Sequence, residues 1–245
     1  MTWVKICGMT NLDDALVAVE AGADAVGFVF YEKSPRCVTV ETAREICSKL
    51  PEKVEKVGVF VDKDVNPLSF LLEAGLSGIQ TYLTQDGLAG SEPRSGPKAI
   101  GSHLLPARAR FMMALPMSLF SDPVSEIESM AEQLAQSKKK LEGALPEGMF
   151  DTFLLDSGNV QQPGGTGKSF DWGRAGPISE SMRRNGLKLV VAGGLNPENV
   201  GEAIQILKPW GVDVASGVET RPGKKDPEKV RAFVRAVRDL DRKVG

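Results

Sequence analysis

The sequence predicts an α/β protein that folds as a single (β/α)8 barrel of the TIM type, with residues 1–245 in one domain. Short apolar runs alternate with helical patterns along the chain, and this alternation is typical of βαβ units around a parallel sheet. The length of 245 residues also matches the usual size of such a barrel. We expect eight strands, at residues 4–8, 25–30, 56–61, 78–83, 110–117, 152–156, 188–192 and 212–215.

The helices between these strands are predicted by capping residues and apolar spacing. In the first helix, Thr10 and Asn11 are typical N-cap residues, and Asp13 and Asp14 favour the positive first turn. Gly22 is expected to end this helix. Similar patterns predict further helices at residues 41–50, 67–74, 122–136, 197–207 and 226–240.

Residues 84–148 are expected to form an irregular, extended segment around the fourth and fifth strands. Glycine and proline residues between positions 87 and 97 exclude a long helix directly after the fourth strand. We place the fifth strand at 110–117, RFMMALPM, because it leads directly into the helix at 122–136. Residues 99–105 are then expected to form a short helix, and residues 84–96 an extended loop over the barrel mouth.

Composition excludes several classes of partner. The formal net charge is only −2, with both signs interspersed, which does not favour nucleic-acid binding. The apolar runs are too short to span a bilayer and the first residues lack a secretory signal pattern, so we expect no membrane role. The odd number of cysteines (Cys7, Cys37 and Cys47) and the lack of a CxxC spacing predict neither disulfides nor a zinc cluster. We therefore expect a cytoplasmic protein.

The single histidine, His103, limits the possible chemistry. One histidine excludes a two-histidine zinc site, and we expect no bound metal. A Ser-His-Asp triad built on His103 is disfavoured because no G-x-S-x-G sequence accompanies it.

Polar and glycine residues close the predicted strands, where barrels of this type carry their functional groups. By itself this pattern predicts a polar mouth but no particular reaction. The residues are Cys7, Gly8, Ser34, Pro35, Arg36, Asp62, Asp156, Ser157, Gly193, Gly194 and residues 213–217.

Five motifs at these strand ends resemble the phosphoribosylanthranilate isomerase family, in order and at comparable spacing. The resemblance covers residues 3–83 and 150–240, and it is specific because separate motifs agree. The family's QLHG sequence after the fourth strand appears here as Gln80-Thr81-Tyr82-Leu83, without the histidine. The motifs are VKICGMTNLDDA, SPRCVT, FLLDSG followed by GGTGKSFDW, VVAGGLNPENV, and GVDVASGVE with PGKKDPEKVRAF.

The resemblance implies a cofactor-free Amadori rearrangement of a small phosphorylated substrate, with Cys7 as the base and Asp156 as the acid. An isolated cysteine is more often a buried core residue, and the motif reverses that interpretation for Cys7. Both groups must be tuned, because an ordinary aspartate is ionised and an ordinary thiol is protonated at neutral pH. Raising the pKa of the acid by roughly three units corresponds to about 4 kcal/mol. Desolvation or a neighbouring carboxylate such as Asp213 can supply this, and Asp213 is also the next candidate for the acid.

The remaining candidate residues are expected to bind the substrate. Glycines after the seventh and eighth strands favour a phosphate site, and Arg36 is expected to bind the anthranilate carboxylate through two parallel hydrogen bonds. Lys5 shares the face of Cys7, where it either favours the thiolate or forms a structural ion pair. Residues 164–167, GGTG, are expected to form either a lid or a plain turn. The predicted substrate-binding residues are Lys5, Arg36, Gly193, Gly194, Asn196, Asp213, Ser216 and Gly217.

Two other functions remain open at this point. Indoleglycerol-phosphate synthase shares the fold, but its catalysis relies on lysines at strand ends, where this chain carries Cys7 and Asp156. A non-catalytic binding protein on the same barrel is the second alternative, because fold alone does not establish chemistry. The sequence is compatible with both a monomer and a homodimer.

Overall fold

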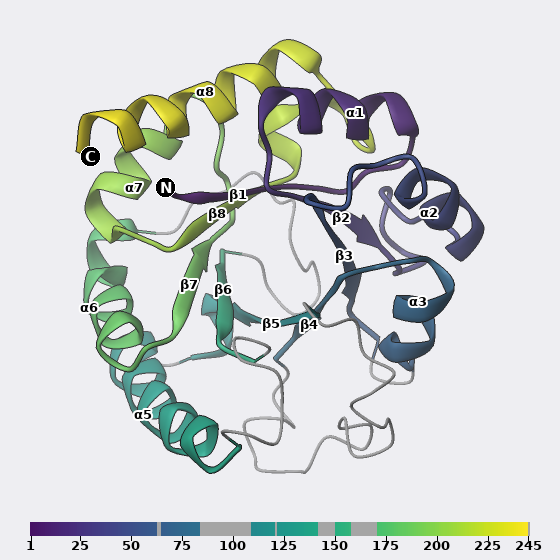
Figure 1. Ribbon diagram of the computed structural model, residues 1–245. Helices are drawn as coiled ribbons and strands as arrows, with labels where there is room; N and C mark the ends of the chain where they lie inside the picture. The colour runs from purple at the N-terminus through teal and green to yellow at the C-terminus, as the bar shows by residue number, and fades with distance from the viewer. Residues whose placement is uncertain (63–64, 84–108, 121, 142–149, 158–170, 245) are drawn as a thin grey trace.

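The computed structural model confirms the predicted barrel: eight parallel strands close into one sheet, and β8 pairs with β1 (Figure 1). The structure describes residues 1–62, 65–83, 109–120, 122–141, 150–157 and 171–244. The strands are β1 (Trp3–Cys7), β2 (Ala25–Val29), β3 (Glu55–Phe60), β4 (Gly78–Tyr82), β5 (Arg110–Pro116), β6 (Thr152–Asp156), β7 (Lys188–Val191) and β8 (Gly211–Val214).

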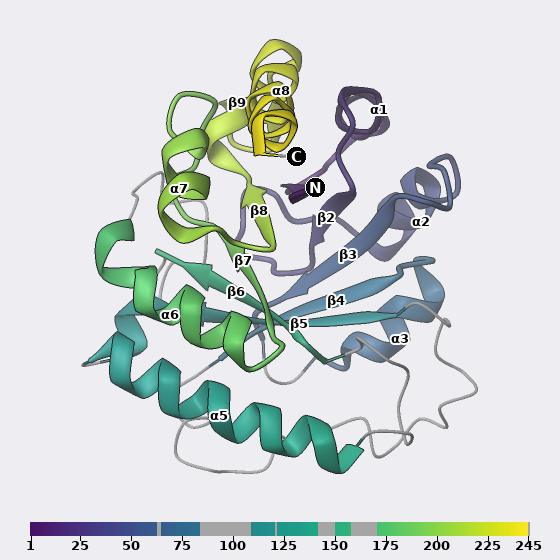
Figure 2. The ribbon, with the colours of Figure 1, turned by 60° about the vertical axis from the view of Figure 1, so that its left-hand side comes forward.

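Helices form the outer layer around this sheet (Figures 1 and 2). A short segment after β8 contains the 3-10 turn Ser216–Val218 and a two-stranded hairpin, β9 (Glu219–Arg221) and β10 (Lys224–Lys225). The helices of the described residues are α1 (Leu12–Ala21), α2 (Val40–Cys47), α3 (Pro67–Glu73), α5 (Pro123–Leu141), α6 (Trp172–Arg184), α7 (Val200–Leu207) and α8 (Pro227–Val244).

Capping explains where α1 begins and ends. The Asn11 side chain accepts a hydrogen bond from the Asp14 amide, and Gly22 closes the helix in the left-handed conformation at φ 96°. By contrast, α6 is absent from the expected helices, because Gly173, Gly176 and Pro177 weaken its pattern. Its N-cap Asp171 accepts hydrogen bonds from two amides of the first turn, which compensates for these residues.

The prediction for the fifth strand is confirmed. β5 lies between β4 and β6, with Gly78 opposite Arg110 on one side and Pro116 opposite Asp156 on the other. The proline falls on the last residue of the strand, where a missing N–H is tolerated. The helix expected at 99–105, the loop at 84–96 and the GGTG segment at 164–167 lie outside the described residues.

Successive side chains of each strand point alternately outward, toward the helices, and inward, into the barrel. Along β1, Val4 and Ile6 pack in the apolar layer beneath the helices. Trp3, Lys5 and Cys7 point into the barrel, in order from its floor to its mouth. Trp3 stacks on Trp210 with ring centroids 5.2 Å apart and closes the floor. The interior is thus apolar around Trp3 at the floor and carries buried polar groups from Lys5 up to Cys7.

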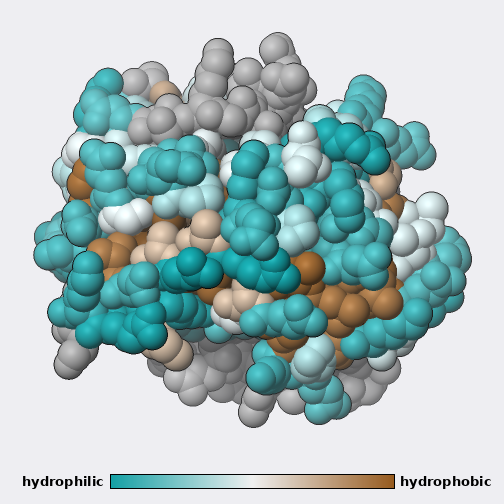
Figure 3. All heavy atoms as spheres, turned by 90° about the horizontal axis from the view of Figure 1, so that it is seen from above, coloured by the Kyte–Doolittle hydropathy of each residue, from teal (hydrophilic) through white to brown (hydrophobic). Residues whose placement is uncertain are grey.

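The first and last helices pack side by side and join the two ends of the chain (Figure 1). Asp241 on α8 accepts hydrogen bonds from the backbone N–H and hydroxyl of Thr2, and Arg238 forms an ion pair with Asp24 at 2.7 Å. The face of the molecule on the side of these two helices is mostly hydrophilic, with smaller apolar areas among the hydrophilic residues (Figure 3).

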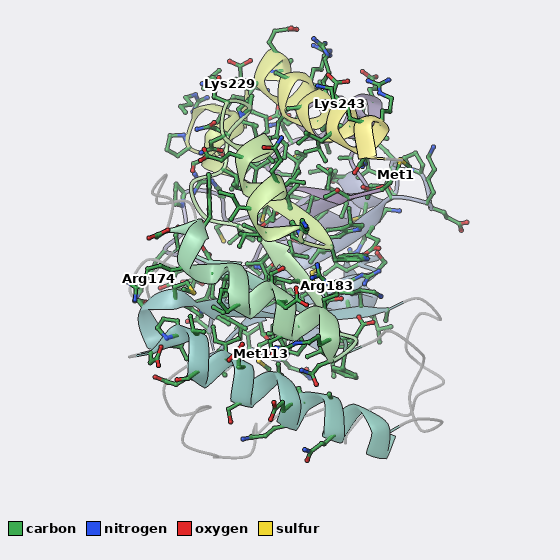
Figure 4. All side chains as sticks on the ribbon, turned by 90° about the vertical axis from the view of Figure 1, so that its left-hand side faces the viewer. Met1, Met113, Arg174, Arg183, Lys229 and Lys243 are labelled. Carbon is green, nitrogen blue, oxygen red and sulfur yellow. The ribbon has the colours of Figure 1, made fainter. Side chains whose placement is uncertain are left out.

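The helices also present charged side chains to solvent along the neighbouring face (Figure 4). Arg174 and Arg183 lie at opposite ends of α6, and Lys229 and Lys243 at opposite ends of α8; all four are exposed. None of the helices within the described residues is long and apolar enough to cross a bilayer.

Candidate functional site

A pocket opens at the carboxyl ends of the strands, where both predicted proton-transfer residues meet. It brings together most of the predicted site residues, although they are far apart in the sequence. Lys5, Asn196 and Gly217 do not line it. The lining residues include Cys7, Arg36, Gln80, Tyr82, Asp156, Gly193, Gly194, Asp213 and Ser216, with the apolar side chains of Val29, Val59 and Leu195 among them.

Cys7 is the last residue of β1, and its side chain is only 7% exposed. Gly27 lies opposite it on β2, where a Cβ atom would stand 2.7 Å from the Cys7 sulfur. The missing side chain therefore makes the room that the thiol occupies. Burial raises the pKa of the Cys7 thiol, and the ammonium groups of Lys5 and Lys225 oppose this shift without cancelling it. The free protein consequently holds Cys7 as a thiol at neutral pH.

The pH dependence of Cys7 alkylation tests this protonation state. Because only the thiolate attacks iodoacetamide, the raised pKa predicts an alkylation rate that climbs steadily with pH and does not level off below about pH 8.5. Peptide mass spectrometry measures the rate at Cys7 separately from those at Cys37 and Cys47. A plateau reached near neutral pH would show that the thiolate is already formed, contrary to the effect of burial.

Lys5 lies one layer below Cys7 and is fully buried. Its ammonium group forms an ion pair with Asp213 at 3.0 Å and donates a hydrogen bond to Gln80 at 2.9 Å. Burial by itself lowers the pKa of Lys5, but Asp213 and Cys7 outweigh it and raise the pKa. Both roles predicted for Lys5 are therefore compatible with its position: it is ion-paired inside the barrel, and its charge favours the thiolate of Cys7.

Asp156 ends β6 on the other side of the pocket and is 3% exposed. The hydroxyl of Tyr82, at the end of β4, lies 3.4 Å from its Oδ2 atom. Burial, followed by the charge of Asp156, holds the pKa of Tyr82 well above its usual range, so this phenol stays protonated and can donate. Tyr82 occupies the position of the histidine in the family's QLHG sequence, and its hydroxyl gives this strand a polar contact with the predicted acid.

Arg36 follows β2 and lines the pocket, but its guanidinium already has a partner inside the protein. Glu219 accepts two hydrogen bonds from it, at 2.9 Å from Nε and 2.7 Å from Nη2. Arg36 therefore makes the expected pair of parallel hydrogen bonds with the carboxylate of Glu219, through the edge of the guanidinium that carries Nε and Nη2. Glu219 thus occupies this edge, and Nη1 lies on the other edge.

The glycine loops after β7 and β8 come close to their neighbours through the backbone. A Cβ on Gly193 would lie 2.2 Å from the Ser157 hydroxyl, and one on Gly217 would lie 1.8 Å from the Leu195 carbonyl oxygen. Only glycine fits at either position. The Asn196 side chain accepts hydrogen bonds from the amides of Glu198 and Asn199, at 2.9 and 3.0 Å. It caps the turn that leads into α7.

Sequence reasoning missed several polar residues that contact the predicted ones, Tyr82 among them. Gln80 could have been found from strand alternation, since it lies on the interior face of β4. Glu219 and Lys225 lie in the hairpin after β8, and only their place inside the quoted GVE and PGKKD sequences marked them. The described residues contain no group of three or more potential ligands that could hold a metal ion.

Comparison with known proteins gives one consistent family. A family model described as N-(5'phosphoribosyl)anthranilate (PRA) isomerase matches residues 4–85 and 125–236. A protein of Chlorobaculum parvum named N-(5'-phosphoribosyl)anthranilate isomerase is 40% identical over 243 residues, which cover 99% of this chain and 97% of that protein.

Solved structures agree with the sequence matches. A crystal structure of phosphoribosyl anthranilate isomerase in complex with reduced 1-(o-carboxyphenylamino)-1-deoxyribulose 5-phosphate has a TM-score of 0.67 and 34% identity, over 98% of this chain and 100% of that one. A structure of monomers generated from the dimeric Thermotoga maritima isomerase has a TM-score of 0.67 and 33% identity, over 97% and 99% of the two chains.

Proposed function

The chain belongs to the N-(5'-phosphoribosyl)anthranilate isomerase family, and we propose that Cys7 and Asp156 are the base and the acid of its reaction. The enzyme converts N-(5-phosphoribosyl)anthranilate to 1-(2-carboxyphenylamino)-1-deoxy-D-ribulose 5-phosphate, an Amadori rearrangement in tryptophan biosynthesis. One observation carries the proposal: a thiol and a carboxyl group, both nearly buried, line one pocket at the ends of β1 and β6.

The reaction needs one proton donor and one proton acceptor. Asp156 protonates the ring oxygen of the ribose, and the sugar opens to a Schiff base. Cys7 reacts as the thiolate, the minor form at neutral pH, which forms by loss of the thiol proton to solvent and which Lys5 and Lys225 favour. The thiolate removes the proton from the second carbon of the sugar, which gives an enolamine that tautomerises to the ketone. Donation requires Asp156 to be protonated when the substrate binds.

The substrate's phosphate is proposed to bind at the loops after β7 and β8. Gly193, Gly194 and Ser216 line the pocket there, and glycine backbone lets N–H groups approach an anion closely. Gly217 supports this site from behind, since its lack of a side chain lets the two loops touch. The pocket thus offers an anion site at these loops and, in addition, the guanidinium of Arg36, which fits a substrate with a phosphate and a carboxylate.

Arg36→Met is expected to weaken substrate binding more than it slows the chemistry. The arginine is proposed to bind the substrate carboxylate, a group that takes no part in the proton transfer. We expect KM to rise by about tenfold or more, with a smaller change in kcat. Steady-state kinetics separate the two constants, and a large fall in kcat at an unchanged KM would contradict the assignment.

A product assay with two substrates tests the proposed function. The purified protein is given phosphoribosylanthranilate and, separately, the carboxyphenylamino-deoxyribulose phosphate that indoleglycerol-phosphate synthase consumes. We expect turnover of the first and no indole formation from the second. Absence of turnover with both substrates would favour a non-catalytic binding protein.

We also propose that residues 1–245 act as one barrel domain in the cytoplasm. All three cysteines are free thiols, and the proposed base works only when its sulfur is reduced. The reducing cytosol preserves that state.

A further inference from the structure

Lys225, on β10, is a buried cation that the reaction described above does not use. Its side chain is 1% exposed, and its ammonium group donates hydrogen bonds to three oxygen atoms. These are the Cys7 carbonyl at 2.6 Å, the Ala215 carbonyl at 3.2 Å and Glu219 Oε1 at 2.8 Å. Since Cys7 ends β1 and Ala215 follows β8, one ammonium group ties two neighbouring strand ends together.

A second link leads from this lysine to Arg36, the proposed anchor of the substrate carboxylate. Glu219 accepts from Lys225 with Oε1 and from the Arg36 guanidinium with both of its oxygens. Arg36 and Lys225 lower the pKa of Glu219 against the effect of its burial, so it carries a full charge at neutral pH. The cluster of Arg36, Glu219 and Lys225 therefore holds two cations and one anion. This leaves one positive charge for an anionic substrate to balance.

The cost of burying Lys225 argues that its charge has a use. Burial lowers the pKa of Lys225, and Glu219 opposes the shift. An apolar side chain of similar length would fill the same space without desolvating a charge, and such replacements of buried ions are often neutral or stabilising. What an apolar residue cannot supply is a donor for the Cys7 carbonyl and a counterion for Glu219.

We propose that Lys225 is a positioning residue of this isomerase, which fixes the backbone of Cys7 directly and the guanidinium of Arg36 through Glu219. The proposal rests on the roles given above to Cys7 and Arg36. It makes one ammonium group responsible for the placement of both the proposed base and the proposed carboxylate anchor.

The cation has an electrostatic effect on the base as well. Lys225 approaches Cys7 from the hairpin, while β1, β4, β6, β8 and the segment after β2 contribute the other charged or titratable groups around the thiol. Removal of the Lys225 charge is expected to disfavour the thiolate and to slow its alkylation. The groups that surround Cys7 are Lys5, Asp213, Tyr82, Asp156, Arg36 and Lys225.

The test compares Lys225→Met with Lys224→Met in the full-length protein. Lys224 is the adjacent residue of the same hairpin, but its side chain is 42% exposed and pairs with Asp14, away from Cys7 and Glu219. For Lys225→Met we expect kcat to fall roughly 10²-fold, because small displacements of reacting groups have effects of this size. Alkylation of Cys7 at pH 8 should slow about tenfold. Lys224→Met should change neither by more than about twofold.

A structural role alone would give a different result. If Lys225→Met lowers only the unfolding temperature and keeps the kcat, the KM and the Cys7 alkylation rate of the parent, the proposal is wrong. Alkylation is measured without turnover. Failure of this proposal is therefore distinguishable from failure of Cys7 as the base.

Glu219→Gln provides the second variant, in case Lys225→Met does not fold. It keeps the shape of the side chain but removes the charge that pairs with Arg36 and Lys225. We expect binding of the reduced product analogue, measured by calorimetry, to weaken about tenfold. Unchanged or tighter analogue binding would overturn the link between Lys225 and Arg36.

Discussion

Replacement of Cys7 by serine is expected to lower kcat/KM by roughly 10²–10⁴-fold while the barrel stays folded. Serine keeps the size of the side chain, so it fits the space beside Gly27. A hydroxyl does not ionise at neutral pH and cannot supply the anion that removes the proton. Steady-state kinetics with phosphoribosylanthranilate measure the loss, and circular dichroism checks the fold.

Cys37→Ser is the matched control for this variant. Cys37 is a free thiol close to the second strand, with intermediate exposure, and it does not line the pocket. We expect it to keep the activity of the parent. If Cys7→Ser retained activity within about fivefold of the parent, far short of the loss expected for a positioned base, Cys7 would be rejected as the base.

Replacement of Asp156 by asparagine is expected to remove ring opening, with a loss of similar size, roughly 10²–10⁴-fold in kcat. The amide matches the shape of the carboxyl group and still accepts a hydrogen bond from Tyr82, but it cannot deliver a proton to the ribose oxygen. Binding of the reduced product analogue should change little. Kinetics and calorimetry together distinguish loss of chemistry from loss of binding.

Asp151→Asn serves as the control, at the residue directly before the same strand. Asp151 lies directly before β6, at the opposite end of the strand, and pairs with Lys188 at 2.9 Å. Any effect of this substitution should fall on stability rather than on turnover. Substantial turnover in Asp156→Asn with intact analogue binding would direct the search for the acid to Asp213, which also lines the pocket.

The fold was predictable where apolar periodicity was strong. The strand at 152–156 was predicted with the bounds that the structure gives, and β5 was placed correctly by the rule that a strand leads into its helix. The helix α6 could not be predicted by the same method, because Gly173, Gly176 and Pro177 hide its apolar face. Tertiary packing supplies the stability that its local sequence lacks.

The pocket was predictable to the extent that strand ends meet at one edge of a barrel. Cys7 and Asp156 could therefore be placed in the same site from their positions at strand ends. The partners of the charged residues were not predictable: Arg36 pairs with Glu219, 183 positions away, which lies in a hairpin that was not expected. Asn196 shows a different limit. It was selected for its place in a motif, and that place does not reveal that its side chain caps a turn.

Gly193 connects the proposed phosphate site with the proposed acid. Its backbone packs so tightly on Ser157 that the proposed phosphate loop touches the residue next to the acid. On this assignment, anchoring the phosphate also fixes the strand end that holds Asp156. The phosphate takes no part in the reaction, but the energy of binding it then helps to align the proton donor. This energy raises the rate of the reaction instead of the affinity for the substrate.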